Sequence, residues 1–166
     1  MGMARHVFYA LHHEADHSRI VGLLQSHAVE GNLTPSQAQW AKLKRGGDFA
    51  TRRWVEEQLK GRSCTVVLIG KDTATQPLVH YAVNRSRQLK MGLLGIHIHG
   101  LNDEHGRPGE KGENVFDHPE CGLGSISGKI PVFDPPGTDS QMVYRYIVDN
   151  IAQWADEAAA LSRAWS

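Results

Sequence analysis

The chain has 166 residues, of which 40% are hydrophobic and 22% charged, as in an ordinary globular domain. Lys plus Arg and Asp plus Glu both number 18, so the balanced charge argues against nucleic acid or an anionic membrane as a partner. The sequence has no long apolar run and no signal-peptide pattern, so we expect neither a membrane span nor secretion. Only Cys64 and Cys121 are present, which fits a reducing cytoplasm better than a disulfide framework.

Strand-forming and helical patterns alternate along the chain, beginning with a short apolar run rich in strand formers. The segment CTVVLI is apolar without alternation, as expected of a strand that is covered on both faces. We expect strands at 6–11, 64–69, 93–98 and 129–133, and helices at 15–29, 35–43, 48–59, 77–90 and 143–161.

Several residues mark where these helices begin and end. Asp48 suits an N-cap, Gly61 a stop signal, and Pro77 the first helical position, where no amide partner is needed. The last helix has the clearest apolar stripe, formed by Val143, Ile147, Ile151, Trp154, Ala158 and Leu161.

Strands that alternate with helices predict an α/β protein of one domain, 1–166, with a mostly parallel sheet of about five strands and helices on both faces. In a flavodoxin-like strand order, the crevice lies past the carboxyl ends of the first and third strands. With 6–11 as the first strand and 64–69 as the third, the loops at 11–14 and 70–73 enter this crevice. The architecture therefore places the expected site there.

The loop Gly70-Lys71-Asp72-Thr73 precedes a helix and could hold a phosphate through backbone amides, a lysine and a hydroxyl. It is not a Walker loop, and a plain strand-to-helix turn with a threonine cap is an equal alternative. The histidine-rich stretch 12–17 and the residues His97, His99, His105, His118 and Cys121 match no standard zinc spacing, so we expect no metal site. No nucleophile with a partner base is evident.

Three segments resemble a known family: VLIGKDTA at 67–74, VHYAVNRS at 79–86 and GLLGIHI at 92–98. Their order and spacing are similar to those of the TIR-like proteins of the bacterial Thoeris anti-phage defence system. The similarity covers most of the chain except 31–47, and it also includes 5–12, 112–117 and 143–146.

This resemblance implies a flavodoxin-like TIR fold, a cytoplasmic protein and the use of NAD as substrate rather than as bound cofactor. It also implies an ADP-ribose-derived signal that diffuses to a partner effector. The family's catalytic glutamate, however, corresponds to Ala82, while Leu78 replaces a tryptophan and Ala10 a serine. Because three residues around one pocket depart from the family, natural divergence is favoured over a single introduced substitution.

We therefore expect a Thoeris-type protein that binds NAD or an ADP-ribose-type nucleotide but cleaves NAD weakly or not at all. Two alternatives remain: a non-catalytic sensor or assembly module that forms homo-oligomers, and a different nucleotide enzyme whose base is His12 or His80. We expect His80 to face solvent. The predicted nucleotide-binding residues around Ala82 are Phe8, Tyr9, Ala10, His12, Gly70, Lys71, Thr73 and Leu78.

Overall fold

The computed structural model describes residues 6–32 and 34–164, so Arg5, at the start of the resemblance, lies outside the described residues. In these described ranges, five parallel strands form one sheet in the order β2-β1-β3-β4-β5, which is the flavodoxin-like order. The predicted fold class is therefore confirmed. The strands are β1 (His6–Ala10), β2 (Glu30–Gly31), β3 (Cys64–Ile69), β4 (Gly92–His97) and β5 (Val132–Phe133).

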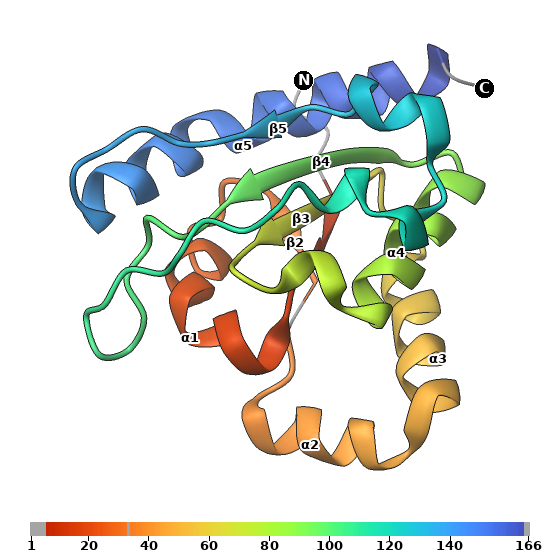
Figure 1. The fold of residues 1–166 in the computed structure, drawn as a ribbon, viewed down its shortest axis with the longest axis horizontal. Coiled ribbons are helices and arrows are strands. Elements are labelled where there is room, and N and C mark those ends of the chain that lie inside the picture. The colour runs from red at the N-terminus through yellow and green to blue at the C-terminus, as the bar shows by residue number, and fades with distance from the viewer. Residues whose placement is uncertain (1–5, 33, 165–166) are drawn as a thin grey trace.

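Within the described residues, five helices accompany the sheet, and α2 lies at the edge of the molecule farthest from α5 (Figure 1). None of the helices in the described ranges is long and apolar enough to cross a membrane. The helices are α1 (His13–Leu24), α2 (Gln37–Arg45), α3 (Gly47–Leu59), α4 (Pro77–Gln88) and α5 (Ser140–Ala164).

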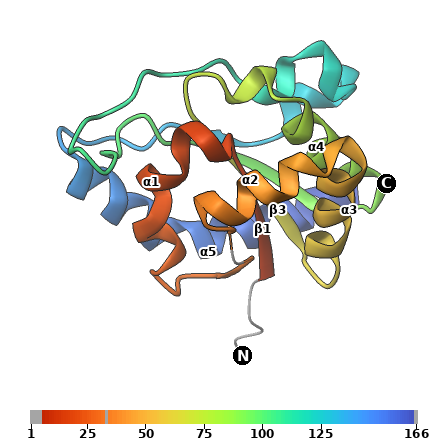
Figure 2. The ribbon, with the colours of Figure 1, turned by 90° about the horizontal axis from the view of Figure 1, so that it is seen from below.

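The sheet separates two hydrophobic cores, because neighbouring residues of a strand point to opposite faces. Val7 and Tyr9 of β1 pack with α1 and α5 on one face, while Phe8 and Ala10 pack with α3 and α4 on the other. In Figure 2, α2 and α3 follow one another across the side of the molecule opposite α5. The two cysteines are free and buried, with Cys64 in the first core and Cys121 in the second.

Several helix boundaries differ from those predicted. The first helix begins at His13 and ends at Leu24, so the expected range 15–29 was displaced toward the carboxyl end. Asp48 does not cap α3; the helix begins one residue earlier, at Gly47, whose positive φ of 78° suits a glycine after the end of α2. Pro77 begins α4, as predicted.

The long segment between β4 and β5 contains three short 3-10 helices rather than a featureless loop. Val115 and Phe116 from the first of these are buried in the core that also holds α4. The Cys121 thiol contacts the carbonyl oxygen of Val115 at 3.2 Å, within the same segment. This loop is thus part of the packed interior next to α4.

Candidate functional site: a crevice at the carboxyl end of β1

The site follows from the strand order. From β1, the chain passes through α1 to β2 on one side, whereas β3 and α4 lie on the other side. Because the strand order reverses direction at β1, a crevice opens past the carboxyl ends of the strands, where open α/β sheets usually bind their ligands. The loop after β1 and the first turns of α4 border this crevice, whereas the second loop expected there, 70–73, lines a different cavity.

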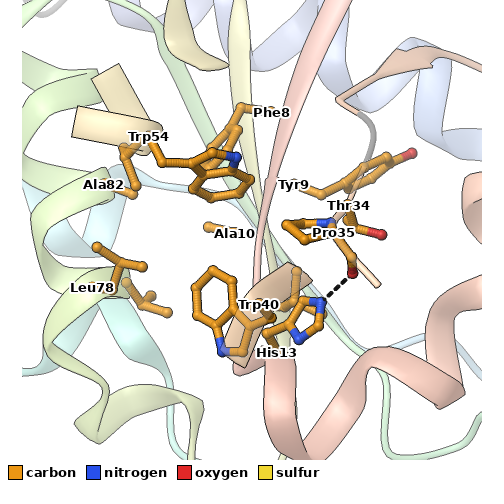
Figure 3. A pocket seen from close by; sticks show the side chains of 13 residues that line it. Phe8, Tyr9, Ala10, His13, Thr34, Pro35, Trp40, Trp54, Leu78 and Ala82 are labelled. Carbon is orange, nitrogen blue, oxygen red and sulfur yellow. Dashed lines mark hydrogen bonds between the residues drawn. The ribbon is translucent and has the colours of Figure 1, made fainter. Parts of the chain in front are cut away.

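A small pocket, called the closed pocket here only because of its small volume, lies around Ala82 (Figure 3). Its volume of about 20 Å³ has room for little more than one water molecule. Ala82 is only 1% exposed and lies in the hydrophobic core shared by α3 and α4. The pocket is lined by Phe8, Tyr9, Ala10, Leu11, His13, Thr34, Pro35, Trp40, Trp54, Val55, Leu78, Val79 and Ala82.

Aromatic rings form much of the pocket wall. Trp54 of α3 makes edge-to-face contacts with Phe8, at 5.9 Å between ring centroids, and with Trp40 of α2, at 5.8 Å. Trp40 in turn stacks on His13 at 4.7 Å. Such aromatic pairs stabilise packing beyond the area that they bury. The four rings therefore connect β1, α1, α2 and α3 around the space that Ala82 faces (Figure 3).

His13 connects the start of α1 to the segment after β2. Its Nε2 lies 2.7 Å from the carbonyl oxygen of Pro35, so this nitrogen donates the hydrogen bond (Figure 3). Burial lowers the pKa of His13, because removal from water disfavours the imidazolium form. The neutral ring serves here as a structural connection in the pocket wall.

A second, larger space adjoins the closed pocket; it has a volume of about 160 Å³ and is called the open cavity because of this larger size. Leu78, Val79, Trp40 and His13 line both spaces, but the open cavity lies toward the first turn of α4 and away from Ala82. Its polar lining residues are His12, His13, Glu14, Lys44, Asp48, Thr51 and Gln76, and the rest of its wall is apolar. The part of the crevice with room for a ligand group therefore offers both polar and apolar contacts.

Glu14 is held at the wall of the open cavity by α2. The Nε1 atom of Trp40 donates a hydrogen bond to Glu14 Oε1 at 3.0 Å, and Lys44 Nζ lies 3.4 Å from the same oxygen. The hydrogen bond from Trp40, followed by the charge of Lys44, lowers the pKa of Glu14. This carboxylate is consequently ionised at neutral pH.

Gly70 and Lys71 line a third cavity, of about 270 Å³, which they share with Asp16, Arg19 and Glu110. Lys71 Nζ pairs with Glu110 at 2.9 Å. A Cβ atom on Gly70 would lie 2.2 Å from Asp16 Oδ2, so a buried carboxyl group touches the predicted phosphate loop. Burial also raises the pKa of Asp16.

The hydroxyl of Thr73 forms a hydrogen bond within its own turn. It accepts a hydrogen bond from the Gly70 amide at 2.8 Å, and Thr73 is completely buried. This bond closes the strand-to-helix turn, but the expected threonine cap is not formed, because neither the 3-10 helix Thr73–Thr75 nor α4 has a side-chain cap. The phosphate role of the loop stays a prediction, and neither Gly70 nor Lys71 lines the space next to Ala82.

Of the predicted site residues, five line the closed pocket together: Phe8, Tyr9, Ala10, Leu78 and Ala82. His12 lies next to them in the open cavity. Tyr9 is a core residue whose backbone amide donates to Asn32 Oδ1 at 2.7 Å, and burial raises the pKa of its phenol.

His80 is buried, and the expectation that it faces solvent was wrong. Its Nε2 lies 2.6 Å from the carbonyl oxygen of Ala74, and its ring stacks on His118 at 4.5 Å. Neither pocket next to Ala82 includes His80, so the structure gives no support to a base at this position. Within 6–32 and 34–164, no group of three or more His, Cys, Asp or Glu is placed to hold a metal ion.

Trp40, Trp54 and Glu14 line the crevice but were not among the site residues predicted from the sequence. Trp40 lies in the polar segment that matched the family least, yet its side chain is only 7% exposed. A large aromatic residue in an otherwise polar helix was the available signal for a ring directed into the crevice. Glu14 lies in the loop 11–14 that was expected to enter the crevice, but its contacts come from a helix more than twenty residues away, which the local sequence does not reveal.

Comparisons with known proteins agree with this architecture. The family model described as "Thoeris protein ThsB, TIR-like domain" matches residues 8–103. The chain is 31% identical over 122 residues to a protein of Bacillus cereus (strain MSX-D12) named "Putative cyclic ADP-D-ribose synthase ThsB1". This match covers 70% of the chain and 63% of that relative, so the chain spans less than two thirds of the relative's length. With its sheet order, crevice and family match taken together, the chain belongs to the Thoeris ThsB TIR-like domain family.

Proposed function

We propose that this chain acts in anti-phage defence of the Thoeris type and binds NAD or an ADP-ribose-type nucleotide in the crevice after β1. In this proposal NAD is a substrate, and the product is an ADP-ribose-derived signal for a partner effector. The observation that carries the proposal is the open cavity, with its charged and polar side chains, beside an aromatic pocket at the strand-order reversal. The name of the relative, a cyclic ADP-D-ribose synthase, supports the same nucleotide class.

Cleavage of NAD by this chain is expected to be weak. Breaking the bond between nicotinamide and ribose builds positive charge on the sugar, and a nearby carboxylate stabilises that charge. At position 82 the chain presents a methyl group inside an apolar pocket. Loss of such a carboxylate typically removes roughly 3–4 kcal/mol of transition-state stabilisation, which is a decrease of about 100- to 1,000-fold in rate.

The size of the two spaces indicates where a nucleotide would bind. A nicotinamide ring cannot enter about 20 Å³, so the closed pocket would have to open by movement of Leu78, Trp40 or Trp54. The open cavity is large enough for a ligand group without such movement. We therefore place the first contacts of the nucleotide against the start of α1 and the first turn of α4.

Calorimetry with ADP-ribose, a dianion, tests this placement. Lys44→Glu reverses a half-exposed charge at the open cavity and should weaken binding at least tenfold. Lys60→Glu is the matched control, because Lys60 also pairs with a glutamate, at 3.1 Å, but lies after the end of α3 that is remote from the cavity. Equal effects of the two substitutions, or no binding by the unaltered chain, would contradict the proposed site.

A second candidate function is a non-catalytic sensor or assembly module. It is favoured by the exposed apolar side chains of Met142, Tyr146 and Leu161 on α5, and by the absence of an acid at position 82. Light scattering that shows self-association, together with no ADP-ribose binding by calorimetry, would support this candidate over the first.

A further inference from the structure

We propose that Glu14, at the start of α1, supplies the carboxylate that position 82 lacks, so that the residual cleavage of NAD takes place in the open cavity. This inference rests on the proposed function, because it assumes that a nicotinamide nucleotide enters the crevice. The carboxylate would then come from α1 and not from position 82 of α4. The reaction would take place in the open cavity, between the start of α1 and the first turn of α4.

The contacts of Glu14 fix one of its oxygens and leave the other for a ligand. Trp40 Nε1 and Lys44 Nζ both contact Oε1, at 3.0 and 3.4 Å. Among the described residues, no hydrogen bond or ion pair uses Oε2. The side chain is about half exposed, so a hydroxyl of a bound ribose can reach this second oxygen. A carboxylate that is oriented by one oxygen and accepts a ribose hydroxyl with the other is preorganised for this reaction.

The other carboxylates near the crevice are less suited to this role. Asp48 also lines the open cavity, but within the described residues no donor fixes its carboxylate. Glu56 is bound by Arg85 at 2.7 Å and by the hydroxyl of Tyr81, and it lines neither the closed pocket nor the open cavity. Asp16 lies in the third cavity, away from the space shared by α2 and α4.

The proposed step is a hydrolysis. The bond between the ribose C1′ and the nicotinamide nitrogen breaks, and its electron pair leaves with nicotinamide. The Glu14 carboxylate stabilises the positive charge on the sugar while a water oxygen bonds to C1′, and Glu14 passes the released proton to solvent. The balance is NAD plus water giving nicotinamide, ADP-ribose and one proton, with no oxidant or metal required.

Glu14→Gln tests the inference without loss of the local structure, because the amide oxygen still accepts the hydrogen bond from Trp40. We expect nicotinamide release, measured with enzyme in excess over NAD, to fall about 100-fold. ADP-ribose affinity by calorimetry should change much less, so that the effect is on kcat rather than on binding. Glu14→Asp should retain an intermediate rate. Glu57→Gln is the control, since Glu57 is an exposed carboxylate of α3 outside the crevice.

The possible outcomes separate this inference from the proposed function. If ADP-ribose binds but the unaltered chain releases nicotinamide no faster than buffer, or Glu14→Gln leaves the rate unchanged, the role of Glu14 is disproved and the binding site stands. If Asp48→Asn abolishes release while Glu14→Gln does not, the acid is Asp48 and the inference is wrong. If no variant binds ADP-ribose, both proposals fail.

Discussion

The hydroxyl oxygens of Thr65 and Ser86 lie 2.6 Å apart in the interior and join β3 to α4. Ser86 Oγ donates to the carbonyl oxygen of Ala82 at 2.7 Å, so the hydroxyl of Thr65 donates to Ser86. Both residues are completely buried. This hydrogen-bond chain fixes the helix that carries position 82 against the central strand of the sheet.

Ser86→Ala should lower the free energy of unfolding by about 1–3 kcal/mol, because the buried hydroxyl of Thr65 loses its acceptor. Thr65→Val combined with Ser86→Ala should cost less than the sum of the two single substitutions, since the double variant leaves no unpaired hydroxyl. Urea denaturation of the four proteins measures this coupling. Strictly additive losses would show that the two hydroxyls act independently.

Ala82→Glu should destabilise the protein rather than simply restore an active site. The substitution adds four heavy atoms, two of them charged, next to a pocket of about 20 Å³, and we expect a loss of roughly 3 kcal/mol. Burial raises the pKa of an unpaired carboxyl group, so the folded form holds its proton more tightly than the unfolded form. The loss should therefore be smallest in acid and grow as the pH rises above the ordinary glutamate range.

Thermal unfolding between pH 4 and pH 8 measures this effect of Ala82→Glu. Ala160→Glu is the matched control, because it places the same side chain on an exposed position of α5. A melting temperature for Ala82→Glu that equals that of the control at every pH would show that the closed pocket opens readily.

Gly70→Ala should lower the free energy of unfolding by about 1–3 kcal/mol, because its Cβ would lie 2.2 Å from Asp16 Oδ2. In an Asp16→Ala background the cost of the same change should be smaller, since the contacting carboxyl group is gone. Gly128→Ala, whose Cβ would meet nothing within 4 Å, should be close to neutral. Urea midpoints compare these variants; equal effects at 70 and 128 would contradict the packing.

Stability should fall as the pH is lowered through the ordinary histidine pKa of 6.5. Burial depresses the pKa of folded His13, so at mildly acidic pH the unfolded chain binds a proton that the folded chain does not. His97, whose pKa burial also lowers, contributes in the same direction. The free energy of unfolding from urea titrations at pH 5, 6 and 7 should therefore rise with pH.

His13→Gln should make this rise smaller, because glutamine does not titrate and its amide can still donate toward Pro35. His105→Gln serves as control, since His105 is well exposed. If His13→Gln kept the full pH dependence, another group would be responsible for it.

The strand pattern of the sequence predicted the sheet well, because β1, β3 and β4 are buried and apolar along nearly their whole length. The two-residue strand Glu30–Gly31 was not predicted, since a pair of polar or small residues carries no periodic signal. Its pairing with β1 depends on tertiary contacts, including the close approach of Gly31 to the ring of Tyr9.

The position of the crevice was predictable from strand order, but its division into separate spaces was not. Gly70 and Lys71 were expected to share one site with Ala82, whereas they line a cavity bordered by Asp16 and Glu110. In that cavity the side chain of Asp16, from α1, lies against Gly70 in the loop after β3. Contacts of this kind depend on how α1 packs against the sheet, which no local pattern of residues encodes.

The reactivity of each of the two buried thiols depends on one side of the sheet. Cys64 and Cys121 lie in different cores with the sheet between them, and burial raises the pKa of Cys64 to about 12 and that of Cys121 to about 11. Neither can react as a thiolate while its own side of the sheet stays closed. The rate at which each thiol is alkylated therefore reports the opening of one half of the protein, and it distinguishes local loosening near α4 from global unfolding.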